Sequence, residues 1–222
     1  MIILTVKIQI VKLLEEAFFF MLGKDKMTFH NESEKDKMLK GVWYNANFDK
    51  ELIDERMYAK DLCHQLNQLR PSDMQSRNRL LRKILQNVEL DTVEILSPFI
   101  VDYGYNVYIG EGSFLNHNIY LMDCAEIRIG KKCFIGPNCG FYTAIHPLAA
   151  EPRNEGLEMA KPINIADNVW IAADVTVMPG VKIGKGSVIG AKSLVSKDIP
   201  AGVLAYGNPC KVVKRLGQDI SV

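Results

Sequence analysis

Residues 165–195 read IADNVWIAADVTVMPGVKIGKGSVIGAKSLV. Within this stretch a branched aliphatic residue returns at every sixth position, namely at Ile165, Ile171, Val177, Ile183, Ile189 and Val195. Gly or Ala directly follows four of these six residues, and a small or branched residue lies four positions after each of them. A period of six fits neither the period of a helix nor the alternation of a flat strand. It is typical of a solenoid whose short strands and tight turns form stacked coils, so the sequence predicts a mainly β protein with a β-helix.

The repeat extends toward the N-terminus and is interrupted once. Spacings of six begin near Ile95, and the register slips by two residues at Val107/Ile109 and again at Ile127/Ile129. A polar, proline-containing segment at about residues 143–162 then breaks the repeat before it resumes. Long irregular segments inside compact domains are usually functional. We therefore expect a β-helix over residues 94–203, with a catalytic loop at 142–163.

The flanking regions have different patterns. Apolar residues at helical spacing predict a small N-terminal helical cap at 27–93, in front of the β-helix. Residues 204–222 predict a tail with a short basic helix that closes the other end. Residues 1–26 are apolar, but charged residues interrupt them, and no run reaches the roughly 20 apolar residues that span a bilayer. This extension receives no role, and no membrane partner is expected.

Composition narrows the functional classes. The 27 Lys and Arg residues against 26 Asp and Glu residues lack the basic excess of a typical nucleic-acid binder. The five cysteines form no CxxC pair, and no signal peptide is evident. Reduced thiols in a cytoplasmic protein are the better interpretation.

His146 is the candidate catalytic residue, because it lies in the only long excursion from the repeat. Glu158, at the end of the same excursion, can bond one imidazole nitrogen and fix the tautomer. Asn116 and Asp123 lie in earlier coils, from which they can point to the same edge.

Other chemistries fit less well. Only His117 and His146 fall within the repeats, whereas a zinc site of this kind needs three histidines, so we expect no metal. Cys124 and Cys139 occupy positions at which a small residue packs, and packing explains them better than a covalent mechanism does. The glycines are explained by the repeat turns, and no phosphate-binding GxxxxGK[ST] loop is present.

Five blocks carry a family resemblance: EKDKMLKGVWYNA (34–46), DYGYN (102–106), YTAIHP (142–147), KPINIADNVWI (161–171) and VSKDIPAGVLAYGNPCKVVK (195–214). With them the chain resembles the hexapeptide-repeat acyltransferases, and specifically the maltose/galactoside O-acetyltransferase group. The resemblance implies a left-handed parallel β-helix and a homotrimer with active sites between subunits. It also implies direct transfer of an acetyl group from acetyl-CoA to a sugar hydroxyl.

The resemblance assigns roles to particular residues. His146 matches the catalytic base, and Glu158 matches an acid that orients it. Asp102 and Asn116 match positions that contact the acceptor, and Asp123 lies beside another such position. Positions along the CoA channel are matched by Trp170, Ala173, Ala191, Ser196 and Lys197, and basic positions near the CoA phosphates by Lys211 and Lys214. Without the resemblance, the two lysines read as a solvated basic end.

One difference from the family pattern leaves the identity of the acceptor open. Some members have an acid near the start of the cap that contacts the sugar, and Ala46 occupies that position here. Asn45 or Asn47 can substitute for the acid as a hydrogen-bonding group. A galactoside, maltose or glucose, a cell-envelope sugar and a non-sugar alcohol all stay possible.

Two alternative functions stay open. A xenobiotic- or serine-type acetyltransferase shares the scaffold and the histidine but differs in the cap and the loop. A non-catalytic β-helix assembly subunit keeps the repeats but loses the histidine and the CoA-channel residues, both of which this sequence retains.

Overall fold

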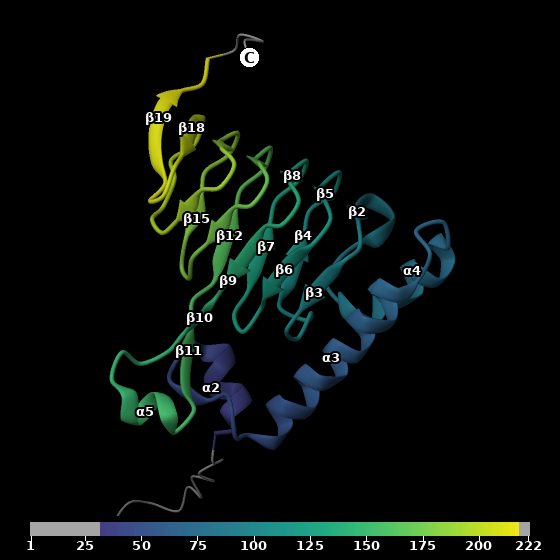
Figure 1. Cartoon of the computed structure of the whole chain (residues 1–222), viewed down its shortest axis with the longest axis vertical. Helices are drawn as coiled ribbons and strands as arrows, with labels where there is room; N and C mark the ends of the chain where they lie inside the picture. The colour runs from purple at the N-terminus through teal and green to yellow at the C-terminus, as the bar shows by residue number, and fades with distance from the viewer. Residues whose placement is uncertain (1–31, 218–222) are drawn as a thin grey trace, which may run out of the picture. The chain divides into compact units, whose positions relative to one another are not determined.

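The computed structural model describes residues 32–217, which contain a parallel β-helix of six coils (Figure 1). The predicted extension at 1–26 lies outside the described residues. Three sheets form the walls of the β-helix. Face 1 contains β2 (Glu94–Ile95), β5 (Phe114–Leu115), β8 (Phe134–Ile135), β13 (Trp170–Ile171), β16 (Val188–Ile189) and β18 (Val203–Tyr206). Face 2 contains β3 (Phe99–Val101), β6 (Ile119–Met122), β9 (Gly140–Tyr142), β14 (Thr176–Val177) and β17 (Leu194–Val195). Face 3 contains β4 (Val107–Ile109), β7 (Ile127–Ile129), β12 (Ile163–Ile165) and β15 (Lys182–Ile183).

The six-residue repeat forms the core as predicted. All six aliphatic residues of the repeat are buried, and strand pairing stacks each on its equivalent in the next coil, as in Ile129–Ile165–Ile183. The two slips of register coincide with β4 and β7, three-residue strands whose first and third side chains both point inward. Burial of these side chains is the main stabilising contribution, at roughly 25 cal/mol per Å² of apolar surface.

Helices close the N-terminal end of the stack. The cap consists of α2 (Glu34–Lys40), β1 (Tyr44–Asn45), α3 (Lys50–Gln68), α4 (Met74–Ile84) and the 3₁₀ turn η1 (Leu90–Thr92). From α3, the Asn67 amide donates to the backbone oxygen of Phe99 at 3.0 Å and accepts from its N–H at 2.9 Å. Asn67 thereby supplies two of the hydrogen bonds that a further coil would give to β3, so the backbone of Phe99 is not left unpaired at this end.

The C-terminal end differs from the prediction. The expected basic helix is a strand, β19 (Lys211–Arg215), which pairs antiparallel with β18 and extends face 1. Two adjacent β-branched residues, Val212 and Val213, favour an extended backbone, and β18 offers a free edge for pairing. None of the helices in the described residues is long and apolar enough to cross a membrane.

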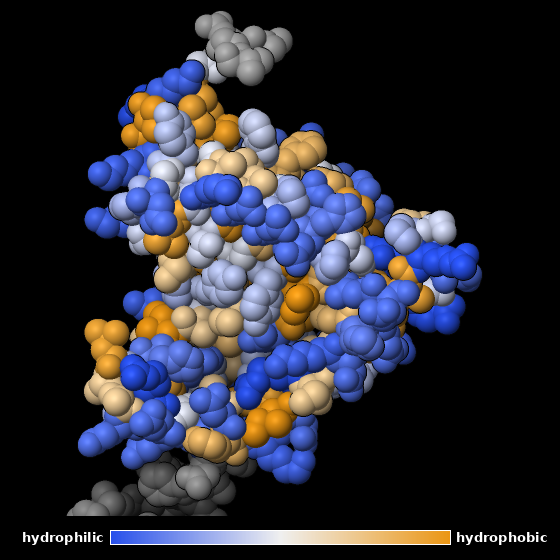
Figure 2. All heavy atoms as spheres, in the orientation of Figure 1, coloured by the Kyte–Doolittle hydropathy of each residue, from blue (hydrophilic) through white to orange (hydrophobic). Residues whose placement is uncertain are grey.

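The interruption of the repeat is an ordered excursion. It contains β10 (Ala144–Ile145), α5 (Ala150–Asn154) and β11 (Leu157–Ala160). β11 pairs antiparallel with β10 on one side and with β1 of the cap on the other. The excursion therefore projects from the wall of the β-helix beside α2 (Figure 1). On the face drawn in Figure 2, hydrophilic residues dominate and hydrophobic residues are scattered among them.

Each turn from face 3 to face 1 passes through one residue in the left-handed region. These residues are Gly112, Lys132, Asn168, Gly186 and Gly202, with φ between 54° and 73°. Glycine and asparagine adopt this conformation readily, whereas other residues pay roughly 1–2 kcal/mol. Lys132 is the one of these five residues that is neither glycine nor asparagine, so the left-handed backbone is least favourable there.

We therefore expect Lys132→Asn to raise the free energy of unfolding by about 0.5–1 kcal/mol, because asparagine accepts the left-handed backbone at lower cost. Denaturant unfolding followed by circular dichroism measures the change. The matched control is Lys131→Asn at the neighbouring position, where φ is not positive and the stability gain should be absent. Equal effects of the two substitutions would contradict the explanation.

Candidate active site

His146 directly follows β10, and its side chain is 44% exposed. Its Nδ1 lies 3.2 Å from the carbonyl oxygen of Leu157. A carbonyl oxygen only accepts hydrogen bonds, so this contact places the hydrogen of a neutral imidazole on Nδ1. Nε2 then carries the free lone pair, as a general base requires.

Glu158 faces the other ring nitrogen. Its Oε2 lies 3.5 Å from Nε2 of His146, and its side chain is 10% exposed. Glu158 lies beside His146, but the group at Nδ1, where the tautomer is set, is the Leu157 carbonyl and not Glu158. At this position the carboxylate can stabilise the imidazolium that forms when Nε2 takes up a proton.

A tyrosine of the cap binds the oxygen of Glu158 that does not face His146. Tyr44 and Glu158 are register partners in the β1–β11 pair, and the Tyr44 hydroxyl donates to Oε1 of Glu158. Burial raises the pKa of Tyr44 far above its usual value, and the nearby Cys124 and Glu158 add to the effect. The phenol is therefore a donor at any physiological pH. No pattern in the sequence indicates this contact, because the two residues lie 114 positions apart.

A second buried acidic group lies beside the first. Asp102 is 8% exposed, accepts from the Tyr120 hydroxyl at 2.6 Å, and lies 3.8 Å from the thiol of Cys124. Burial raises the pKa of the Cys124 thiol well above its usual value, and the charges of Glu158 and Asp102 raise it further. This thiol stays protonated, which makes it a poor nucleophile. The interpretation of Cys124 as a packing residue is confirmed.

Asp123 does not line the site, and its prediction as an acceptor contact is wrong. The side chain is fully buried, and its two oxygens accept from the backbone N–H groups of Asp102, Tyr103, Gly104 and Asn106. Burial raises the pKa of Asp123 to about 6, while these N–H groups oppose the shift. Its role is to hold the loop between β3 and β4, which carries Asp102.

The two predicted asparagines lie in different places. Asn45 donates to the carbonyl of Glu155 at 2.9 Å and accepts from the N–H of Phe48 at 2.9 Å, so its amide joins the cap to the excursion. Asn116 follows β5, at the turn between face 1 and face 2. The excursion leaves at the opposite edge of face 2, so one subunit does not bring Asn116 to His146.

Strand pairing aligns several of the residues predicted for CoA. Trp170 is 53% exposed on face 1. A row of neighbouring strand positions runs from Trp170 across face 1 to Lys214 of β19, by way of Val188 and Leu204. Lys211 pairs with Tyr206, and a register shift within β18–β19 leaves both lysines opposite outward-facing residues. Three strand spacings, roughly 14 Å, therefore separate Trp170 from Lys214 on one surface.

The remaining predicted positions lie on the turns. Ala173 and Ala191 lie on the turns from face 1 to face 2 in successive coils, where the N–H of Lys192 donates to the carbonyl of Ala173 at 3.0 Å. Ser196 and Lys197 follow β17 at the opposite edge of face 2, the edge from which the excursion leaves.

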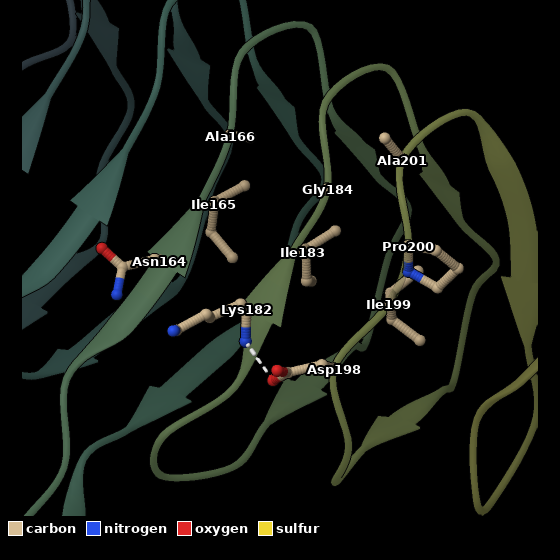
Figure 3. Close-up of a pocket in the computed structure, with 10 residues that line it drawn as sticks. All are labelled: Asn164, Ile165, Ala166, Lys182, Ile183, Gly184, Asp198, Ile199, Pro200 and Ala201. Atoms are coloured by element: carbon tan, nitrogen blue, oxygen red, sulfur yellow. Dashed lines mark hydrogen bonds between the residues drawn. The ribbon is translucent and has the colours of Figure 1, made fainter.

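A groove of about 680 Å³ lies elsewhere, across face 3 (Figure 3). Its polar side chains are Asn164, Lys182 and Asp198, and Asp198 accepts from the backbone N–H of Lys182 at 2.8 Å. None of the residues predicted for catalysis or CoA binding lines this groove. Between residues 32 and 217 no three His, Cys, Asp or Glu side chains are grouped so that they could hold a metal ion.

Comparison with known proteins identifies the family. Two family models match, a maltose acetyltransferase hexapeptide capping motif at residues 37–89 and the bacterial transferase hexapeptide, six repeats, at residues 162–197. A Staphylococcus aureus (strain MRSA252) protein named "Putative acetyltransferase" is 53% identical over 85% of this chain and 94% of its own length. The chain belongs to the maltose/galactoside O-acetyltransferase group of the hexapeptide-repeat acyltransferases.

Solved structures agree with this assignment. A maltose O-acetyltransferase from Clostridium difficile 630 is 40% identical, with a TM-score of 0.79 over 84% of this chain and 98% of that chain. A hexapeptide-repeat-containing acetyltransferase from Vibrio cholerae O1 biovar eltor, complexed with acetyl-CoA, is 34% identical, with a TM-score of 0.75 over 84% of this chain and 100% of that chain. This member of the group is a CoA-dependent acetyltransferase, and acetyl-CoA is its co-substrate.

In this acetyltransferase we expect Asp123→Asn to lower the free energy of unfolding by about 2–4 kcal/mol, because the amide NH₂ would face backbone N–H groups that need an acceptor. Thermal unfolding followed by circular dichroism measures the loss. The control is Asp198→Asn, an exposed carboxylate with one backbone N–H at 2.8 Å, which should cost less than about 1 kcal/mol. A change at Asp123 no larger than at Asp198 would show that the loop does not depend on it.

Proposed function

We propose that this protein transfers the acetyl group of acetyl-CoA directly to a hydroxyl of a sugar, with His146 as the general base. The observation that carries the proposal is the contact of Nδ1 with the Leu157 carbonyl, which leaves Nε2 as a proton acceptor on a half-exposed ring. The proposal also draws on the family, whose members are named for this reaction.

The chain's own residues account for the proton transfers. Nε2 of His146 takes the proton of the acceptor hydroxyl as that oxygen attacks the thioester carbonyl, a role commonly worth roughly 10²–10⁴ in rate. Glu158 stabilises the resulting imidazolium from 3.5 Å. His146 then returns the proton to the departing thiolate sulfur. The protonated Cys124 is a poor nucleophile, which supports direct transfer without an acyl-enzyme at this residue.

A sugar is the acceptor class that the cap favours. The capping motif at residues 37–89 is described as that of maltose acetyltransferases, and its strand β1 pairs with the excursion that carries Glu158. Relatives of known structure are a maltose O-acetyltransferase and a galactoside acetyltransferase in complex with coenzyme A, the latter 31% identical with a TM-score of 0.75 over 83% of this chain and 91% of that chain. Among the residues predicted to contact the acceptor, Asp102 lies near Glu158, because the thiol of Cys124 interacts with both carboxylates.

The placement of the predicted residues supports a homotrimer with shared active sites. Ala173 and Asn116 lie at the edge of face 2 that adjoins face 1 with Trp170, whereas the excursion with His146 leaves from the other edge. A cyclic trimer that brings the first edge of one subunit against the second edge of its neighbour completes each site.

His146→Ala should lower kcat at least about a hundredfold and leave the Kd for CoA nearly unchanged, because the base acts on the acceptor. A free-thiol release assay with acetyl-CoA across a panel of mono- and disaccharides measures kcat, and calorimetry measures CoA binding. His64→Ala, on the exposed side of α3, is the matched control and should retain full activity. Wild-type turnover in His146→Ala would exclude this residue as the base.

Light scattering should give the mass of a trimer, and mixed trimers test the shared site. Trp170→Ala and His146→Ala subunits, each nearly inactive alone, are unfolded together and refolded as a mixture. Activity should partly return, because some sites then receive His146 from one subunit and Trp170 from its neighbour. A mixture as inactive as its components would show that both residues come from the same subunit.

A further inference from the structure

We propose that Tyr44 is a positioning residue for the reaction, and that its phenol holds the carboxylate of Glu158 against His146. The segment that caps the β-helix thereby takes part in the proton transfer. This inference rests on the proposed function, in which His146 is the general base. Nothing in the capping motif itself assigns such a role to Tyr44.

The geometry places Tyr44 behind the pair and not in contact with substrate. Its side chain is 1% exposed, so no acceptor molecule reaches it. Its hydroxyl donates to Oε1 of Glu158, while Oε2 of the same carboxylate faces Nε2 of His146 at 3.5 Å. One oxygen of Glu158 thus bonds the phenol and the other faces the imidazole, and the thiol of Cys124 is a further hydrogen-bond partner of this carboxylate. The antiparallel pairing of Tyr44 with Glu158 fixes this arrangement in the backbone.

The charge distribution explains why the phenol matters. A carboxylate taken out of water is costly unless hydrogen bonds compensate it, and a donor to the ionised form favours that form. Three other groups face Glu158: the imidazole of His146, the protonated thiol of Cys124 and the phenol of Tyr103. The Tyr103 hydroxyl accepts a hydrogen bond from Arg56 at 2.6 Å. Tyr44 is therefore the group whose hydroxyl donates directly to the carboxylate.

Loss of the phenol hydroxyl makes the carboxylate more basic, wherever the proton finally resides. Without this donor the negative charge of Glu158 is no longer shared with a phenol, so the carboxylate stabilises an imidazolium at His146 more strongly, and the Glu158–His146 pair takes up its proton at a higher pH. The base is active only when that proton is absent. The acid limb of the pH–rate profile should consequently move toward higher pH.

The first test is the pH profile of kcat/KM for the acceptor in Tyr44→Phe. A hydrogen bond to a charged group predicts an upward shift of the acid limb by about one pH unit and a loss of activity of about tenfold near neutral pH. The KM for acetyl-CoA should stay unchanged. Tyr105→Phe is the matched control, since its hydroxyl donates to Glu55 at 2.8 Å in the cap, and its profile should keep the wild-type limb.

The second test asks whether Tyr44 acts through Glu158. In Glu158→Gln the carboxylate is gone, so adding Tyr44→Phe should produce no further displacement of the acid limb. A further displacement in the double variant would show that Tyr44 acts by another route and would overturn the inference. Tyr44→3-fluorotyrosine, a stronger donor of the same shape, should move the limb toward lower pH. It also serves as the test if Tyr44→Phe fails to fold.

A direct readout separates this inference from the proposed function. NMR titration of the His146 imidazole, assigned by its absence in His146→Ala, should show the same upward displacement in Tyr44→Phe without any assay of turnover. His146→Ala could be inactive while Tyr44→Phe changes neither the acid limb of the pH–rate profile nor the titration of the imidazole. That result would contradict the role of Tyr44 and leave His146 as the general base. If His146→Ala is fully active, the proposed function itself fails.

Discussion

Stacking of inward aliphatic side chains in strict register is the constraint on which the rest of this molecule depends. Each strand of the wall pairs in parallel with its equivalents before and after it, so a segment inserted into one coil finds no partner in the stack. Its backbone groups still need hydrogen bonds. The segment between β9 and β12 therefore leaves the wall, pairs with itself through β10 and β11, and takes β1 as a third strand. His146 projects from the β-helix for this reason.

The same constraint makes the cap necessary. A β-helix exposes an unpaired edge at its first coil, and Asn67 of α3 satisfies the Phe99 backbone there in place of another coil. Once the chain has closed this end, its preceding segment is positioned to pair with the excursion. Tyr44 and Glu158 become neighbours as a result. Closing the fold and placing the acidic partner of the histidine are thus two effects of one segment.

The sequence was sufficient for features that repeat or that stand out against the repeat. Ile165 and its equivalents predicted the coils, and the break near residue 143 marked the position of His146. Contacts between distant segments could not be predicted from the sequence. Tyr44, for example, belongs to no repeat that would relate it to Glu158. Asp123 was mistaken for an acceptor contact because a carboxylate that binds four backbone N–H groups looks the same in sequence as an exposed one. The C-terminal strand was mistaken for a helix, since its pairing with β18 is a tertiary effect.

The contrast between Cys124 and His146 argues for direct transfer in the proposed reaction. Both lie next to Glu158, but the carboxylate acts on them in opposite ways. It opposes ionisation of the buried thiol, because thiolate and carboxylate are like charges. It lies 3.5 Å from Nε2 of the half-exposed imidazole, where opposite charges attract once that nitrogen has taken up a proton. This arrangement disfavours Cys124 as a covalent nucleophile and fits the proposed reaction, in which an oxygen of the acceptor attacks the thioester.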